Sequence, residues 1–111
     1  MKLPKDAIID PRKITHYLLV RRANGDKSRF LALAGYDSDH ADRLIADLRE
    51  QILPLDAEVL ESTEHGQFYQ IRTSLTGPTG RMLRVRTIWM TEHLSRQTKF
   101  VTLVPDKAPT A

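Results

Sequence analysis

The segment FYQIRTSLTGPTGRMLRVRTIWM, residues 68–90, decides the fold. Apolar and polar side chains alternate in residues 68–76 and again in residues 81–90, with the period of two that is typical of a β-strand. The intervening Gly77-Pro78-Thr79-Gly80 predicts a tight turn, because proline presets one backbone angle and glycine permits a positive φ. The segment therefore predicts a β-hairpin whose second strand buries Leu83, Val85, Thr87 and Trp89.

Two further strands flank this hairpin in the sequence. Residues 57–62 alternate weakly and are followed by a turn at Glu64–Gln67. Residues 98–104 form the last predicted strand, which Pro105 ends. Because consecutive strands with short connections pair with each other, the sequence predicts a four-stranded antiparallel meander.

Helical periodicity precedes the strands. Asp10 as N-cap and Pro11 at the first helical position predict a helix from Pro11 to Leu19, with Ile14, Tyr17 and Leu18 buried. A second helix follows the turn at residues 23–26, with Asp26 as its cap, Phe30, Leu33 and Ala34 on its buried side, and Gly35 at its end. Ser38 is the expected N-cap of the third helix, which Pro54 ends and whose apolar stripe is Ala41, Leu44, Ile45, Leu48 and Ile52.

Helices followed by an antiparallel meander predict an α+β domain of two layers. We expect residues 10–105 to form this single domain, after a lead-in at residues 1–9 whose Ile8 and Ile9 pack against the core. Residues 106–111 are expected to be a disordered tail.

Composition limits the classes of function. The 111 residues contain no cysteine, which excludes disulfides and thiolate metal sites. No apolar run approaches the roughly 20 residues that span a bilayer, and the first residues lack the apolar region of a secretory signal. The histidines His16, His40, His65 and His93 show no metal-binding spacing, so we expect neither a metal ion nor another cofactor.

Charge is segregated along the chain. No acidic residue occurs from His65 to Thr91, although four arginines do. The sheet face opposite the helices is predicted to carry Gln70, Arg72, Arg84, Arg86 and Thr102. Either this is an ordinary solvated face or it binds an anion, and the spacing of adjacent strands, about 4.8 Å, would let these groups converge.

Four stretches of the chain, DPRKITHYLL, DKSRFLALAGY, GPTGRMLRVRTIWM and KFVTLVP, together resemble a known family. It consists of small bacterial domains of unassigned function that occur free-standing and at the C-termini of polymorphic toxins. The resemblance covers about residues 4–105. Residues that match the family's usual pattern include Lys27, Arg29, Gly35, Gly77, Gly80, Arg86, Trp89 and Thr102, whereas Val104 stands where an aromatic residue is usual.

The order of elements is also similar to the barnase–EndoU–colicin–RelE group of metal-independent ribonucleases. That likeness implies attack on a phosphodiester by the neighbouring 2′-hydroxyl, and cations that stabilise the phosphorane. The candidate catalytic residues are Lys27, Arg86, His16 and Thr102, and the candidate phosphate-binding residues are Arg29, Arg72, Arg84 and Arg81. Arginine suits the phosphate because its planar fork matches two oxygens.

The resemblance implies a toxin-like endoribonuclease that is cytoplasmic or acts in the cytoplasm of a target cell. RNA would be its substrate, and an acidic antitoxin or immunity protein would be its partner. Two other functions fit the same residues: a non-catalytic protein-binding module, and a binder of single-stranded nucleic acid.

Overall fold

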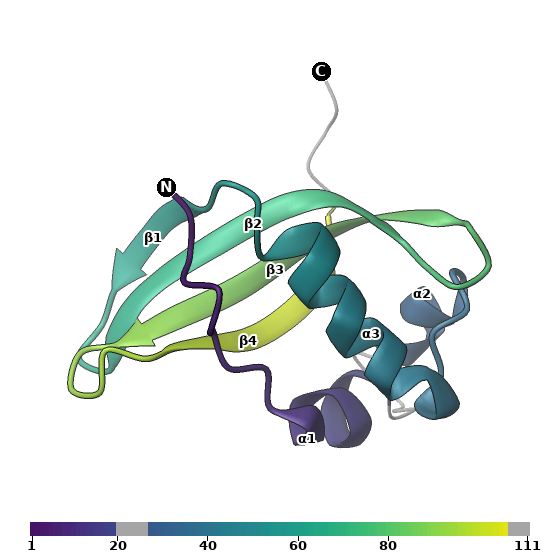
Figure 1. The fold of residues 1–111 in the computed structure, drawn as a ribbon, viewed down its shortest axis with the longest axis horizontal. Coiled ribbons are helices and arrows are strands. Elements are labelled where there is room, and N and C mark those ends of the chain that lie inside the picture. The colour runs from purple at the N-terminus through teal and green to yellow at the C-terminus, as the bar shows by residue number, and fades with distance from the viewer. Residues whose placement is uncertain (20–26, 107–111) are drawn as a thin grey trace.

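The structure is a computed structural model that describes residues 1–19 and 27–106. In this part of the chain, short helices pack on one face of a four-stranded antiparallel sheet with strand order β1-β2-β3-β4, so the predicted α+β class is confirmed (Figure 1). The helical elements are α1 (Pro11–Lys13), η1 (Ile14–Leu18), α2 (Lys27–Ala32), η2 (Ser38–His40), α3 (Ala41–Asp47) and η3 (Leu48–Ile52). The strands are β1 (Glu58–Ser62), β2 (Gly66–Thr76), β3 (Met82–Glu92) and β4 (Thr98–Pro105). The described residues do not include the predicted turn at residues 23–26, the predicted helix cap Asp26, or residues 107–111.

The sheet buries one face against the helices. Alternate residues of β3 are buried, including Val85, Thr87 and Trp89, as the period of two predicts. The Trp89 ring meets Phe100 edge to face, with 5.3 Å between ring centroids, and its Nε1 donates a hydrogen bond to Thr87 Oγ1 at 2.9 Å. Trp89 is therefore a core residue whose polar atom is satisfied inside the core.

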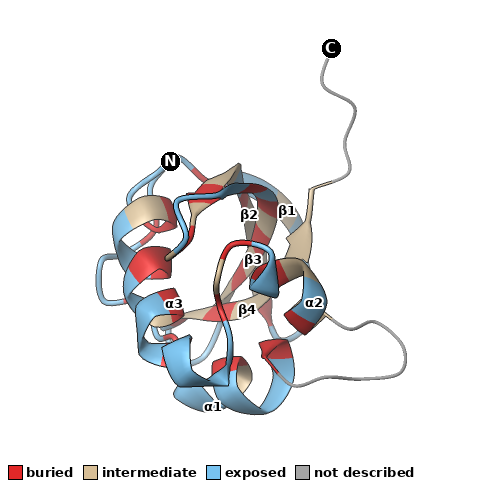
Figure 2. Ribbon diagram, turned by 90° about the vertical axis from the view of Figure 1, so that its right-hand side faces the viewer, coloured by how far each residue is buried: buried red, intermediate tan, exposed pale blue. Residues whose placement is uncertain are grey.

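The long helical segment formed by α3 and η3 supplies the opposing layer (Figures 1 and 2). Leu44, Leu48 and Ile52 of its predicted stripe are fully buried. Gln51 also fixes the segment to β2, because its side chain donates to Thr76 O and accepts from Thr76 N, both at 2.9 Å. Helix and strand are thus joined by apolar packing and by a two-point amide contact.

The N-terminal lead-in runs along the sheet edge. Ile8 forms a parallel bridge with Lys99, through Ile8 N to Thr98 O and Phe100 N to Ile8 O, both at 2.8 Å. The expectation that Ile8 packs into the core is wrong, because a strand-like backbone points successive side chains to opposite sides. Ile9 is buried, whereas Ile8 is 37% exposed.

Tyr17 was expected to be buried, and this is also wrong, because it is 41% exposed. The helix widens at η1 into a π-turn, in which Leu19 N donates to Ile14 O five residues earlier at 3.0 Å. Residues 14, 18 and 19 therefore share the buried face, and Tyr17 turns outward.

Two further local predictions require correction. Leu33 is 49% exposed because α2 ends at Ala32, and Leu31 and Ala34 take the buried positions. The cap before α3 is Asp37 and not Ser38, since the Asp37 side chain accepts from Asp39 N at 2.9 Å at the start of η2.

No helix among the described residues has the length and hydropathy that a membrane span requires.

Candidate functional site

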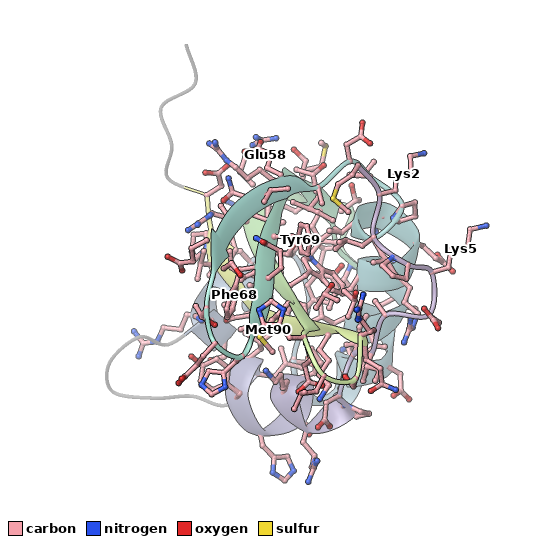
Figure 3. All side chains as sticks on the ribbon, turned by 90° about the vertical axis from the view of Figure 1, so that its left-hand side faces the viewer. Lys2, Lys5, Glu58, Phe68, Tyr69 and Met90 are labelled. Atoms are coloured by element: carbon pink, nitrogen blue, oxygen red, sulfur yellow. The ribbon has the colours of Figure 1, made fainter. Side chains whose placement is uncertain are left out.

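The strand register gathers polar side chains on the sheet face that lies opposite the core. Ile88 of β3 lies between Gln70 of β2 and Thr102 of β4. One step along, Arg86 lies between Arg72 and Val104, and the next step pairs Arg84 with Ser74. These residues define what we call the arginine face: Gln70, Arg72, Ser74, Arg84, Arg86 and Thr102. Phe68 and Met90, which pair across β2 and β3, lie beyond its end (Figure 3).

Lys27 reaches this face from the helix layer. Its Nζ donates to Thr102 Oγ1 at 2.7 Å, although the two residues are 75 positions apart in the chain. The same ammonium lies 3.5 Å from the Tyr17 hydroxyl and 4.9 Å from the centroid of the Tyr17 ring. The tyrosine therefore holds the lysine by a hydrogen bond and by attraction to the ring face.

Arg86 is one diagonal step from Thr102 and is held by a chain of side chains. Its Nε donates to Gln70 Oε1, and Gln70 Nε2 in turn donates to Glu58 Oε2 at 2.9 Å. Gln70 thus accepts from the arginine and donates to the carboxylate. The contact fixes the Arg86 guanidinium on the sheet while its remaining N–H groups can serve a ligand.

Arg72 and Arg84 share one carboxylate. Arg72 Nε and Nη2 donate to the two oxygens of Asp106 at 3.0 and 3.2 Å, and Arg84 Nη2 lies 3.6 Å from Asp106 Oδ2. Arg84 Nη1 also donates to Ser74 Oγ at 3.3 Å. The hydrogen bond and the charge of Asp106 raise the pKa of the Arg72 guanidinium above its ordinary value. Asp106 therefore offsets part of the positive charge of the arginine face.

The structure does not bring the other candidates to this place. His16 is exposed on η1, and among the described residues its side chain takes part in no hydrogen bond or ion pair. Arg29 lies two positions after Lys27 on α2, a spacing that points side chains in different directions, and it lines a separate hollow with Tyr36 and Asp37. Arg81 is exposed in the hairpin turn, ahead of β3.

A shallow hollow adjoins the Lys27–Thr102 pair. It has a volume of about 400 Å³ and is lined by Asp10, Arg12, Lys13, Tyr17 and Val101. Lys13 Nζ donates to Val101 O at 3.3 Å, so a second lysine lies at the edge of β4. Lys2 and Lys5, by contrast, project from the N-terminal segment on the helix side of the molecule (Figure 3).

Tyr17 and Asp106 are site residues that sequence reasoning missed. The sequence predicts a buried Tyr17 because the π-turn leaves no obvious mark in it. Asp106 did carry a signal: continuing the alternation of Thr102 and Val104 by one step places its side chain on the same face. Within the described residues, no three His, Asp or Glu side chains are grouped as a metal site would require.

The fold is similar to that of one chain in a solved complex, a contact-dependent growth inhibition toxin–immunity protein complex from Klebsiella pneumoniae 342. The two chains share 13% sequence identity with a TM-score of 0.61, and the similarity covers 90% of this chain and 100% of the other. At this identity the likeness shows a common fold alone. No curated protein matches the chain.

A protein-family model described as "Domain of unknown function (DUF6883)" matches residues 2–107. This agrees with the resemblance to a domain family of unassigned function, while the likeness to the barnase–EndoU–colicin–RelE group stays a prediction. Because the match spans nearly the whole sequence, the chain belongs to the DUF6883 family of domains of unknown function.

Proposed function

We propose that this domain is an endoribonuclease that cleaves RNA without a metal ion on the arginine face. The observation that carries the proposal is the Lys27–Thr102 hydrogen bond of 2.7 Å, one diagonal step from Arg86. An ammonium, a hydroxyl and a guanidinium from α2, β4 and β3 are thus neighbours at this face. Such a group fits a phosphodiester, because each member can donate to a phosphate oxygen.

In the proposed reaction, the 2′-oxygen forms a bond to phosphorus and the bond from phosphorus to the 5′-oxygen breaks. The products are a 2′,3′-cyclic phosphate and a 5′-hydroxyl, and one proton passes from the 2′-hydroxyl to a base while another is given to the leaving oxygen. Arg86 and Thr102 bind the non-bridging oxygens, where negative charge grows in the transition state. The Lys27 ammonium gives its proton to the leaving 5′-oxygen.

The base is either a water molecule or His16, which does not lie beside the Lys27–Thr102 pair in this structure and would have to reach the 2′-hydroxyl from η1. The His16→Ala variant distinguishes the two. A histidine base predicts a rate loss and a changed acid limb of the pH–rate profile. A water molecule predicts that His16→Ala has wild-type rates. In either case Lys27 and Arg86 keep the roles given above.

The shared fold with a chain of a toxin–immunity complex supports a biological setting for this activity. We propose that the domain is a toxin that is active in the cytoplasm and is neutralised by an acidic immunity or antitoxin protein. Such a protein would cover the arginine face by charge complementarity.

The experiment measures cleavage of total RNA in EDTA by wild type and by Lys27→Met, Thr102→Val and Arg86→Gln. We expect the Lys27 and Arg86 variants to lose about 10²–10³ in rate, as removal of one transition-state donor does. Lys99→Met is the matched control, because Lys99 lies on β4 but pairs with Glu92 at 2.9 Å. It should remain within a few fold of wild type.

The second candidate function is a non-catalytic protein-binding module. One observation favours it: Asp106 already occupies Arg72 and Arg84, so the face carries less free positive charge than its arginines imply. If folded wild type cleaves no RNA in EDTA and does not slow bacterial growth when expressed, the nuclease proposal is wrong. Retention of RNA without product would instead identify a single-strand binder.

A further inference from the structure

The Asp106 carboxylate contacts the guanidinium groups of both Arg72 and Arg84. Its side chain is only 5% exposed, whereas the side chains of Arg72 and Arg84 are 36% and 54% exposed. Arg72 donates two hydrogen bonds to the two carboxylate oxygens, in the fork geometry that arginine also uses for phosphate. The pair of arginines is thus already shaped around a small anion.

The arginines of this face repel one another, and an ion pair with a purely structural role would not need to bear that cost. Arg72 and Arg86 lie directly opposite each other on neighbouring strands, and like charges in that position repel. Arg84 adds a third guanidinium one step along β3. A face that only needed to be soluble would gain nothing from this cluster, whereas a face that binds a polyanion would.

We propose that Arg72 and Arg84 form a second phosphate subsite and that Asp106 is its built-in competitor. The inference rests on the proposed function, and it states what limits the affinity of that site for RNA. Arg84 and Arg86 are two residues apart on β3, a rise of about 6.8 Å, so they can engage successive phosphates of an extended strand. RNA must displace the Asp106 carboxylate before its second phosphate can bind.

Asp106 can be tested without moving the backbone. Its N–H donates to Arg84 O at 3.0 Å, and this bond survives replacement of the side chain. Asp106→Asn keeps the shape and removes the charge. Asp42→Asn is the matched control, because it removes the same charge from an exposed position on α3, in the helix layer.

The probe is a fluorescent single-stranded RNA whose sugars are 2′-O-methylated, so that it binds but cannot be cleaved. Anisotropy titrations at several KCl concentrations give the affinity and its salt dependence. We expect Asp106→Asn to bind roughly tenfold more tightly than wild type and to show a salt slope steeper by about 0.7, the value for one added phosphate contact. Asp42→Asn should change the affinity by less than about twofold.

The gain must depend on the two arginines. In the triple variant Arg72→Gln, Arg84→Gln, Asp106→Asn, the added affinity and the added slope should both disappear. If Asp106→Asn binds no more tightly than Asp42→Asn, Asp106 is a structural clamp and the inference is wrong.

A second measurement uses wild type and does not depend on the stability of a variant. Inorganic pyrophosphate is titrated while the arginine Nε–Hε signals are followed by NMR, and those of Arg72 and Arg84 should shift. Shifts confined to Arg86 would overturn the inference. Neither binding experiment involves cleavage, so the two proposals can fail separately. If the wild type cleaves no RNA but the Asp106→Asn variant gains affinity, the nuclease proposal is wrong and the subsite remains as one for nucleic-acid binding.

Discussion

Gly77 and Ala34 touch so closely that a Cβ atom on Gly77 would come within 2.5 Å of the Ala34 Cβ atom. Thr79 N also donates to Ala34 O at 3.1 Å. The turn between β2 and β3 therefore holds the chain just after α2. Because Lys27 lies at the other end of that short helix, the same contact helps to place its ammonium on the arginine face.

This contact predicts the effect of Gly77→Ala. The added methyl group would meet backbone atoms of Ala34, which cannot move aside as a flexible side chain can. We expect the free energy of unfolding to fall by about 2–3 kcal/mol, as overpacking in a tight contact does. Urea unfolding followed by circular dichroism measures the change.

Gly80→Ala is the control in the same turn. Gly80 has a φ of +86°, but a Cβ atom there would meet nothing within 4 Å. We expect a loss of about 1–2 kcal/mol, from the left-handed backbone alone. Equal losses for the two variants would show that contact with Ala34 is not what requires glycine at position 77.

The helix cap before α3 gives a second prediction. Asp37 accepts from Asp39 N at 2.9 Å and lies 2.6 Å from His40 Nδ1. We expect Asp37→Ala to cost about 1 kcal/mol of stability, as loss of an N-cap does. Ser38→Ala should stay within about 0.5 kcal/mol of wild type, as is usual for an exposed position that caps nothing. A larger loss in Ser38→Ala than in Asp37→Ala would restore Ser38 as the cap.

The sheet could be predicted from sequence because its signal is local. Alternation from residue 68 to residue 90, with a Gly-Pro turn between, fixes both the hairpin and which side chains share a face. That Arg84 and Arg86 lie on one face of β3, and Val85 and Trp89 on the other, follows from that period alone.

What sequence could not supply is the contact between distant segments. Nothing near Lys27 shows that its ammonium meets Thr102, since this depends on how α2 docks against the hairpin. Tyr17 was misplaced for a related reason: the five-residue hydrogen bond of the π-turn rotates the buried face, and helical periodicity assumes a regular turn.

A buried hydroxyl–carboxylate pair lies between α3 and the end of β2. The Tyr36 hydroxyl donates to Asp47 Oδ2 at 2.6 Å and lies 3.2 Å from Thr76 O. Arg43 Nε donates to the same carboxylate oxygen at 3.0 Å. We expect Tyr36→Phe to lower the free energy of unfolding by about 1–3 kcal/mol, because it removes a hydrogen bond to a buried charge.

The same pair makes the free energy of unfolding depend on pH in the alkaline range. Burial, and then the hydrogen bond to Asp47, raise the pKa of the Tyr36 hydroxyl above its ordinary value of 10.0. Above that pH the unfolded chain releases this proton while the folded chain keeps it, so the unfolded state is favoured as pH rises. The contribution of Tyr36 is therefore complete below about pH 10 and is lost above it.

Urea unfolding at intervals between about pH 9 and pH 11 tests this linkage. Wild type should lose stability across that range more steeply than Tyr36→Phe, which has no hydroxyl to ionise. Parallel curves for wild type and Tyr36→Phe would mean that the buried hydroxyl does not control alkaline unfolding.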